Sequence, residues 1–166
     1  MAESTIIKVK GDLTVTISDN GGSNSYTFAK EPGDLAITVP GRGVNLFLDR
    51  GVIGDPPCIR YGDEQPCTGS LTLNLRDVSD ATDVTGAEFI FGPSGQVGST
   101  WVSTLGANGE VPVFTIAITI EGTDHGDSAD HTITCNYCYI TGGLTDGDPV
   151  TLALSWTSFD SYPTVT

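Results

Sequence analysis

The stretch Phe114-Thr115-Ile116-Ala117-Ile118-Thr119-Ile120 places a large apolar residue at every second position, with small residues between. In an extended strand successive side chains point to opposite faces, so this spacing gathers the large side chains on one face. Residues 132–140 repeat the pattern with Ile133, Cys135, Tyr137 and Tyr139 on the apolar face, and residues 150–157 do so with Val150, Leu152, Leu154 and Trp156. The pattern predicts strands with one buried face.

The same alternation occurs upstream at residues 13–17 and 71–75, and shorter candidate strands lie at 5–9, 35–39 and 44–49. Turn-forming residues separate the strands, as in Asp-Asn-Gly-Gly at 19–22. Clean alternation favours antiparallel pairing, because parallel strands covered on both faces are apolar throughout.

One segment departs from the alternation. Residues 79–88 begin with Ser79 and Asp80, which are typical helix-capping residues, and continue with further polar residues. We therefore expect a short helix near 79–88. The whole pattern predicts a single all-β domain over residues 1–166, built as an antiparallel β-sandwich or barrel with one short helix.

The charge of the chain is strongly acidic and unevenly distributed. The 166 residues contain 21 Asp and Glu against 7 Lys and Arg, giving a formal charge of -14. All seven cations lie within residues 1–76 beside nine carboxylates, whereas residues 77–166 carry twelve carboxylates and no Lys or Arg. Neutralisation of the second half must come from the first half, from a neighbouring subunit or from metal ions. This balance argues against a basic nucleic-acid-binding protein.

No apolar run reaches signal-peptide or membrane-spanning length, which predicts a chain that is made in the cytosol and does not enter a membrane. Four cysteines are too few for a disulfide scaffold. Cys58 and Cys67 could meet across a hairpin or loop and form a disulfide in an oxidising medium. Cys135 and Cys138 point to opposite faces unless their strand is interrupted, so buried free thiols are favoured over a zinc site.

Residues 123–131 contain three Asp and two His, but they lack the ligand spacing of an EF-hand. An acidic loop between strands is the favoured interpretation, with calcium binding left open. Phosphate-binding glycine loops and nucleophile elbows are absent from the sequence. Aromatic residues make up 8% of the chain, which is low for a sugar-cleaving site. We expect no enzymatic activity, no metal and no cofactor, although a carboxylate pair of a glycosidase would not be recognisable from sequence.

The polar faces of the predicted strands are unusual because Thr, Ser, Ala and Asn replace the Lys, Glu and Arg of ordinary solvated strands. Such faces could be uncharged solvent surface. Alternatively, they pair with neighbouring subunits or line a shared passage. Edge strands with few lysines are poorly protected against further strand pairing, so assembly by sheet extension is physically easy.

Two stretches, Leu48-Asp49-Arg50-Gly51 and residues 62–77 (GDEQPCTGSLTLNLRD), resemble the central hairpin region of tail tube proteins from long-tailed bacteriophages. The order of strand, acidic loop, strand, turn and final strand up to residue 159 is similar to the closing half of these proteins. The resemblance covers most of residues 40–160. It implies a β-sandwich with one helix, six copies per ring, sheets joined into an inner β-barrel, and rings stacked into a hollow tube of a virion assembled in the bacterial cytoplasm.

The function implied by this resemblance is structural, without catalytic residues. The implied partners are further copies of the chain, the tape-measure protein and tail terminator or tip proteins. Double-stranded DNA would pass through the tube during genome delivery without specific binding.

The charges of the chain suit such a passage. A wall of carboxylates and hydroxyls repels phosphate weakly, over a Debye length of ~8 Å at physiological salt. Candidate lumen residues are Asp12, Asp49, Asp77 and Glu121. Candidate cations for contacts between subunits are Lys8, Lys10, Arg42 and Arg50. For each cation the alternative is a solvated surface charge worth ~0–1 kcal/mol.

A second hypothesis of a different class is an extracellular β-sandwich binding module, such as an adhesin or carbohydrate-binding domain. Such a module needs exposed aromatic side chains in loops. Because Trp156 is predicted on an apolar strand face, Trp101, Tyr61 and Tyr162 are the remaining candidates.

Overall fold

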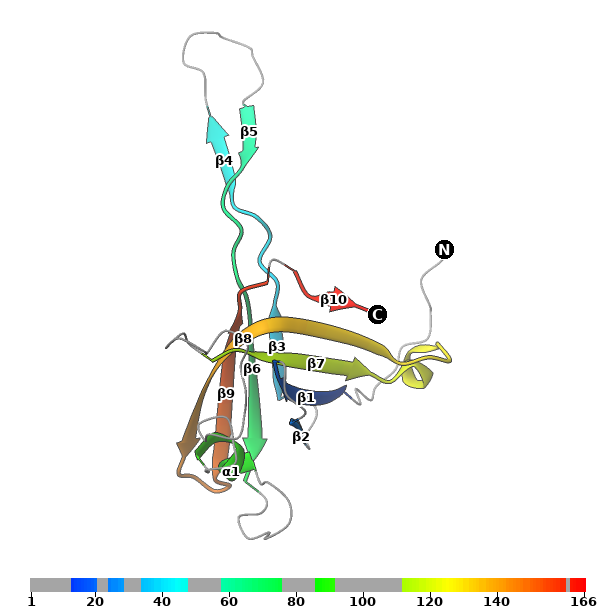
Figure 1. Cartoon of the computed structure of the whole chain (residues 1–166), viewed down its shortest axis with the longest axis vertical. Helices are drawn as coiled ribbons and strands as arrows, with labels where there is room; N and C mark the ends of the chain where they lie inside the picture. The colour runs from blue at the N-terminus through cyan, green and yellow to red at the C-terminus, as the bar shows by residue number, and fades with distance from the viewer. Residues whose placement is uncertain are drawn as a thin grey trace.

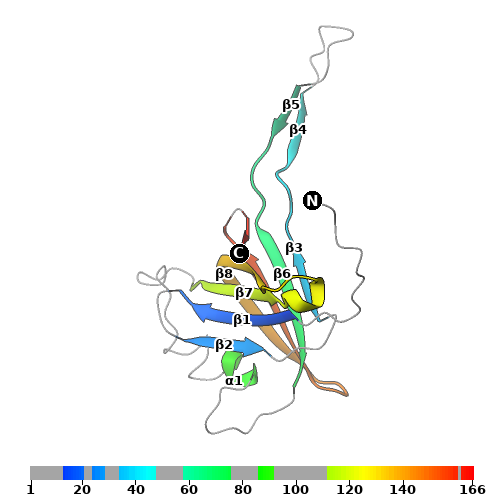
Figure 2. The same cartoon turned by 90° about the vertical axis from the view of Figure 1, so that its right-hand side faces the viewer.

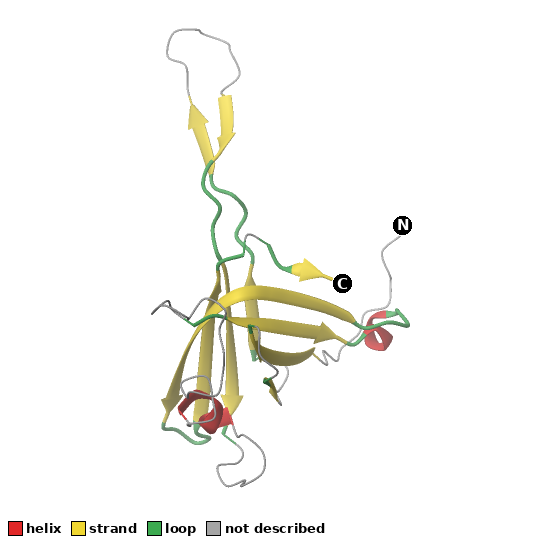
Figure 3. Ribbon diagram, in the orientation of Figure 1, coloured by secondary structure: helices red, strands yellow, loops and turns green. Residues whose placement is uncertain are grey.

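The computed structural model describes residues 13–20, 24–28, 34–47, 58–75, 86–91, 112–160 and 162–166 (Figure 1). Strands dominate these residues, as the alternation predicted, and Figure 3 shows how few helical segments accompany them. The elements are β1 (Leu13–Asp19), β2 (Ser25–Phe28), β3 (Leu35–Thr38), β4 (Val44–Phe47), β5 (Cys58–Tyr61), β6 (Cys67–Asn74), α1 (Gly86–Phe91), β7 (Phe114–Ile120), the 3-10 helix η2 (Gly122–His125), β8 (His131–Thr145), β9 (Thr151–Ser158) and β10 (Thr164–Val165).

Eight strands form one sheet in the order β2-β1-β7-β8-β9-β6-β3, with β10 added beside β8, and every strand pair is antiparallel. The prediction of an all-β, antiparallel fold is confirmed. The sheet does not close into a barrel, since β2 and β3 each have one strand neighbour within the described residues. Strands β4 and β5 pair only with each other there and form a separate hairpin.

Strand β8 joins two layers of the sheet. It is 15 residues long; its first half pairs with β7 and its second half pairs with β9. Cys138 is the residue at which β8 passes from one partner strand to the other, because it pairs with Phe114 of β7 on one side and with Ser158 of β9 on the other. In Figure 1 the strands β1 and β7 run across the direction of β6 and β9, and β8 bends from one layer into the other. The core lies between these crossing layers.

The bend in β8 coincides with a β-bulge. Phe114 pairs with Cys138 and Ile116 pairs with Cys135, so three steps along β8 oppose two steps along β7. The extra residue increases the local twist and bends the strand. Tyr137, inside the bulge, has a φ of 51°, in the left-handed region that non-glycine residues rarely adopt.

Because of the bulge, two predictions about which side chains of β8 point into the core are wrong. Cys135 and Cys138 are both fully buried, because the extra residue returns position i+3 to the core side. Tyr137 and Tyr139, predicted on the apolar face, are instead 43% and 41% exposed. Downstream of the bulge the buried positions are Cys138 and Ile140.

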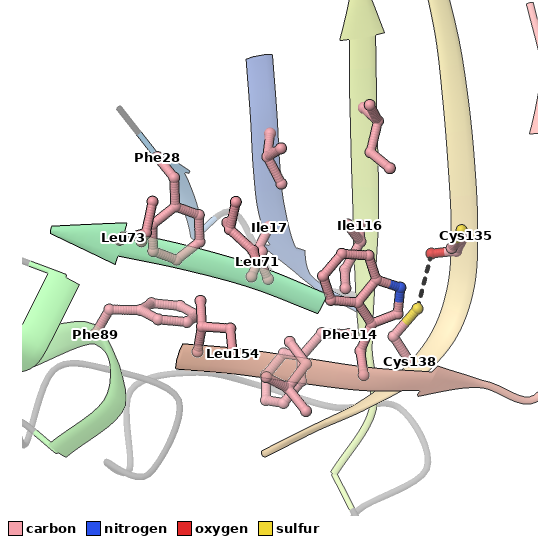
Figure 4. Packing of buried hydrophobic residues seen from close by; sticks show 14 of the residues in the cluster. Ile17, Phe28, Leu71, Leu73, Phe89, Phe114, Ile116, Cys135, Cys138 and Leu154 are labelled. Atoms are coloured by element: carbon pink, nitrogen blue, oxygen red, sulfur yellow. Dashed lines mark hydrogen bonds between the residues drawn. The ribbon is translucent and has the colours of Figure 1, made fainter. Parts of the chain in front are cut away.

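The described helix, Gly86–Phe91, overlaps the end of the segment predicted to be helical and continues three residues beyond it. Residues 79–85 lie outside the described part, so the start of the predicted helix stays a prediction. Phe89 and Ile90 are fully buried. The ring of Phe89 stacks on Tyr26 at 5.2 Å between centroids. It also meets Phe28 edge to face at 5.4 Å, and Figure 4 shows these two side chains in the core. The helical turn therefore forms where two apolar side chains reach the core.

Trp156 fills the core beside a glycine, and its predicted burial is confirmed, at 3% exposed. Its indole ring covers Gly69 of the paired strand β6. A Cβ atom built at Gly69 would overlap the ring. Close packing of this side chain thus requires the absence of a side chain at position 69.

Replacing Gly69 with Ala should lower the free energy of unfolding by about 1–3 kcal/mol, the usual cost of overpacking a core. Urea unfolding followed by Trp fluorescence measures this loss. Gly143→Ala is the matched control, because a Cβ there meets open space. Equal stabilities of the two variants would contradict the described packing of Trp156.

Candidate assembly surfaces

The layer formed by β3, β6, β9 and the second half of β8 carries an uncharged outer face. Its strands alternate between core residues and small outward residues, and none of the residues in 35–38, 67–74, 139–145 and 151–158 is charged. The outward residues are Ala36, Thr38, Thr68, Ser70, Thr72, Tyr139, Thr141, Gly143, Thr145, Ala153, Ser155 and Thr157. We call this surface the hydroxyl face. The alternation of the sequence had predicted the small outward residues of β6 and β9, whereas Tyr139 was predicted on the apolar face and residues 141–145 were not predicted as strand.

The hydroxyl face is exposed and slightly hollowed. A depression of about 300 Å³ lies between β3, β6 and β9, with Thr38, Thr68, Ser70 and Ser155 among its lining residues. Hydroxyl groups can exchange hydrogen bonds with water at such a surface, but they supply no cation to hold a phosphate.

Both lateral edges of the same layer lack a neighbouring strand among the described residues, and we call them the open edges. Strand β3 ends the sheet and pairs with β6 alone within the described residues. At the other edge, pairing of β7 with β8 stops at Cys138, so residues 139–145 have a described strand neighbour on the β9 side only. Each edge presents backbone N–H and C=O groups that a further strand could use.

The direction of the two edge strands follows from the sheet order. From β8 through β9 and β6 to β3 there are three antiparallel steps. Strand β3 therefore runs antiparallel to β8. If a second copy placed its β3 beside the β8 edge of the first, the antiparallel alternation would continue across the contact.

The hairpin β4–β5 projects from the body of the molecule, as Figures 1 and 2 show from two sides. Its register pairs Val44 with Tyr61, and the amide of Gly62 donates to the carbonyl oxygen of Gly43 at 2.6 Å. We call residues 39–47 and 58–66 the arm. Tyr61 is 77% exposed and Val44 is 62% exposed. A two-stranded hairpin has little stability of its own in water, and the exposed side chains of this arm gain no burial from the body.

The arm also carries both Lys or Arg side chains of the described residues, Arg42 and Arg60. Arg42 Nε donates to Glu64 Oε1 at 3.0 Å. This hydrogen bond is the main reason that the pKa of Arg42 is raised. The remainder of the described chain bears carboxylates without Lys or Arg.

Three cysteines meet in the core near the bend of β8. Cys67, Cys135 and Cys138 are buried free thiols, and Cys138 Sγ donates to the carbonyl oxygen of Cys135 at 3.3 Å. Burial raises the pKa of Cys67 to about 11, which keeps its thiol protonated at neutral pH.

The disulfide that the sequence allowed between Cys58 and Cys67 is not formed. Cys67 is free and begins β6 in the core, whereas Cys58 begins β5 in the projecting arm. The hairpin thus separates two residues that are nine positions apart. No cluster of three or more metal-ligating side chains occurs in the described ranges.

The acidic loop after β7 is held by its own carboxylates. Asp127 Oδ1 accepts the amide of Ser128 at 2.6 Å, and its other oxygen lies 2.8 Å from His131 Nε2. Asp130 Oδ1 accepts the amide of Gly122 at 3.1 Å. These bonds give the two carboxylates partners within the loop, as expected for a strand connection.

The structure describes two of the eight charged residues singled out by sequence. Glu121 is exposed after β7 and accepts a hydrogen bond from Thr123 Oγ1 at 2.9 Å; it does not belong to the strands of the hydroxyl face. Arg42 lies in the arm. The other six, which lie outside the described residues, are Lys8, Lys10, Asp12, Asp49, Arg50 and Asp77.

Sequence reasoning did not find the open edges or the arm as a separate unit. Both depend on which strands lack a neighbour, and strand order is a long-range property. A signal for the arm was present in the run of Gly41, Gly43 and Gly62 around short strands. None of the helices in the described parts of the chain is long and apolar enough to cross a membrane.

No protein-family model and no curated protein matches the sequence. The fold does match solved structures. A chain of the anti-feeding prophage baseplate, determined by cryo-EM with six-fold symmetry, aligns with a TM-score of 0.54 and 12% identity over 98% of this chain and 97% of that one. A chain of an extracellular contractile injection system, from its sheath-tube complex in the extended state, aligns at 0.47 and 10% identity over 92% and 87%. At 12% identity the first similarity establishes a shared fold.

The hydrogen bonds of Asp127 predict an acid-sensitive loop. The bond with His131, followed by those from the amides of Ser128 and Ala129, lowers the pKa of Asp127 below its ordinary value of 3.8. The resulting stabilisation is fully present above pH 3.8 and is lost as the pH falls through the lower value of the folded state.

Amide hydrogen exchange of residues 122–131 should therefore be faster in Asp127→Asn than in the unsubstituted chain at pH 5. The difference should shrink as the pH falls below 3.8. Asp146→Asn, in the turn between β8 and β9, removes one carboxylate elsewhere and serves as the control. A difference that does not change with pH would contradict this role of Asp127.

Proposed function

We propose that this chain is the structural subunit of a tail-like tube in a virion, in which six copies form a ring and the rings stack around a hollow passage. The observation that carries the proposal is a four-stranded layer with two open edges and an uncharged outer face. In this proposal residues 1–166 act as one domain and perform no catalysis.

Ring formation would use the two open edges. Strand β3 of one copy would pair with residues 139–145 of the next, and the antiparallel order of the sheet would continue from copy to copy. This contact joins two different edges, so it does not end at a dimer, and copies related by a closing rotation form a ring. The six-fold symmetry of the baseplate structure with the same fold supports six copies.

In such a ring the hydroxyl face would line the passage. Its strands contain no Lys or Arg, so the wall would offer DNA phosphates none of the cationic contacts that produce salt-dependent binding. Double-stranded DNA could then move through during genome delivery without being held. Asp12, Asp49 and Asp77 remain the candidates for weak repulsion at the passage, whereas Glu121, which lies outside the strands of the hydroxyl face, would contribute only if the passage extends past the end of β7.

The proposed partners are further copies of the chain, a tape-measure protein within the passage, and terminator or tip proteins at the ends of the tube. The tube would be part of the virion after assembly in the bacterial cytoplasm. Lys8, Lys10, Arg42 and Arg50 remain candidates for contacts between copies, and the position of Arg42 in the arm supports its candidacy.

The alternative function is an extracellular binding module. The observation in its favour is the exposure of two tyrosine side chains. Of the three aromatic candidates named from sequence, Tyr61 at the end of β5 and Tyr162 are exposed, and Trp101 lies outside the described residues. However, the depression on the hydroxyl face is lined mainly by small residues and offers little aromatic surface for a sugar ring. A chain that stays monomeric at high concentration and binds glycans would favour this alternative.

A proline at the β8 edge tests the ring. Phe159 N donates to Tyr137 O, so odd-numbered residues of this half of β8 point their backbone groups at β9 and even-numbered residues point theirs outward. Leu144→Pro therefore removes an outward N–H while keeping the bonds to β9. We expect folded monomers by circular dichroism and light scattering, with no rings in negative-stain images.

Leu144→Thr is the matched control, because it removes the same apolar side chain but keeps the N–H group. This variant should form rings like the unsubstituted chain. Rings of Leu144→Pro that are as abundant as those of the control would rule out pairing through this edge.

A further inference from the structure

The thiol of Cys135 lies between those of Cys67 and Cys138 in the core. All three are free thiols, and their side chains are at most 1% exposed. A hydrogen bond with the thiol of Cys138 is the largest cause that lowers the pKa of Cys135, and a hydrogen bond with the thiol of Cys67 acts in the same direction. Sulfur atoms at hydrogen-bonding distance can be joined by rotations of their side chains.

The strand register shows that a disulfide within this cluster needs Cys135. Cys67 and Cys138 pair with Ser158 from opposite sides, so their Cα atoms are two strand spacings apart, about 9.5 Å. A disulfide requires Cα atoms within about 7 Å of each other. These two cysteines are therefore too far apart to be joined directly.

Of the two neighbours of Cys135, Cys67 is the better placed partner. The thiol of Cys138 is directed at the backbone of its own strand, where it donates to the carbonyl oxygen of Cys135 at 3.3 Å (Figure 4). The carbonyl oxygen of Asn136 lies 3.8 Å from the same sulfur. Cys67 belongs to another strand, β6, and approaches Cys135 from the other layer of the core.

From this arrangement we propose that Cys67 and Cys135 form a disulfide when the protein meets a peroxide outside the reducing cytosol. The bond would join β6, in the layer of the hydroxyl face, to the first half of β8, in the crossing layer. It would close a loop from residue 67 to residue 135 and restrict the unfolded chain, which stabilises the fold. The bond lies within one copy, so it does not depend on the proposed tube.

The chemistry is a two-electron oxidation of two thiols. The thiolate of Cys135 attacks one oxygen of hydrogen peroxide, the O–O bond breaks, and a sulfenic acid forms at Cys135 with release of hydroxide. The proton lost by Cys135 converts this hydroxide into water. The sulfur of Cys67 then attacks the sulfenic sulfur, the S–S bond forms, and the departing hydroxyl leaves as water with the proton of Cys67.

The cluster favours Cys135 as the thiol that reacts first. The hydrogen bonds from its neighbours lower its pKa, whereas burial raises the pKa of Cys67 to about 11. The charge of Asp160 and the burial of Cys135 act against its ionisation. Solvent comes close at the bulge, because Tyr137 is 43% exposed. Since Cys135 itself is fully buried, the reaction waits for local opening of the bulge and is slow.

Peroxide treatment of the folded full-length chain tests this pair. Cys58→Ser removes the fourth cysteine, which lies in the arm, and leaves the three of the cluster. After oxidation, denaturation and alkylation should find Cys138 as the single free thiol, and the intact mass should fall by that of two hydrogen atoms. Digestion without reductant should release two peptides joined through Cys67 and Cys135. The oxidised form should melt roughly 5–15 °C above the reduced form.

Alanine variants of the Cys58→Ser chain provide the matched comparison. Cys67→Ala and Cys135→Ala should each keep both remaining thiols free after the same treatment. Cys138→Ala, which removes a thiol from the same cluster, should still form the bond. Circular dichroism of the reduced variants monitors their folding, and the digest of the chain with all three cysteines identifies the pair without them. Three alkylated thiols after oxidation, a bond between Cys135 and Cys138, or a sulfinic acid at Cys135 without a cross-link would overturn the inference.

Discussion

The extra residue in the middle of β8 is the constraint on which the rest of the structure depends. An uninterrupted strand would turn Cys135 and Cys138 to opposite faces and would continue beside β7 in one layer. The bulge instead brings both cysteines into the core, and Tyr137 takes a left-handed conformation at the bend. Ser158 Oγ secures this position by donating to the carbonyl oxygen of Asn136 at 2.7 Å. One strand can therefore serve two crossing layers.

The bend has a direct consequence for assembly. Because β8 leaves β7 at Cys138, its second half keeps one edge without a described neighbour, and the layer that it enters has a second open edge at β3. The core stabilises this arrangement from inside. Trp156 lies over Gly69, while α1 packs Phe89 against the aromatic rings of β2 and Ile90 against Gly142 of β8. The outer face remains free of such packing. A rigid layer with open edges is a suitable unit for extending a sheet between copies.

The structure shows where the few described cations of this acidic chain lie in the fold. Residues 77–166 were recognised from sequence as lacking Lys and Arg. In the structure both described cations, Arg42 and Arg60, belong to the arm, where Asp63 and Glu64 balance their charge, whereas the rest of the described chain bears carboxylates without Lys or Arg. Copies of a chain with a charge of -14 repel one another, so association needs complementary patches.

By itself, the sequence determined the strand content, the antiparallel pairing and the small uncharged residues of the hydroxyl face, because alternation is a local property with a period of two residues. It did not determine the faces of Tyr137 and Tyr139, since one inserted residue reverses the alternation beyond it. The described residues of α1 bring Phe89 and Ile90 into the core, a burial that the capping residues upstream did not predict. Only the tertiary structure decided which edges stay open and where the arm projects, because strand order depends on contacts between residues far apart in the chain.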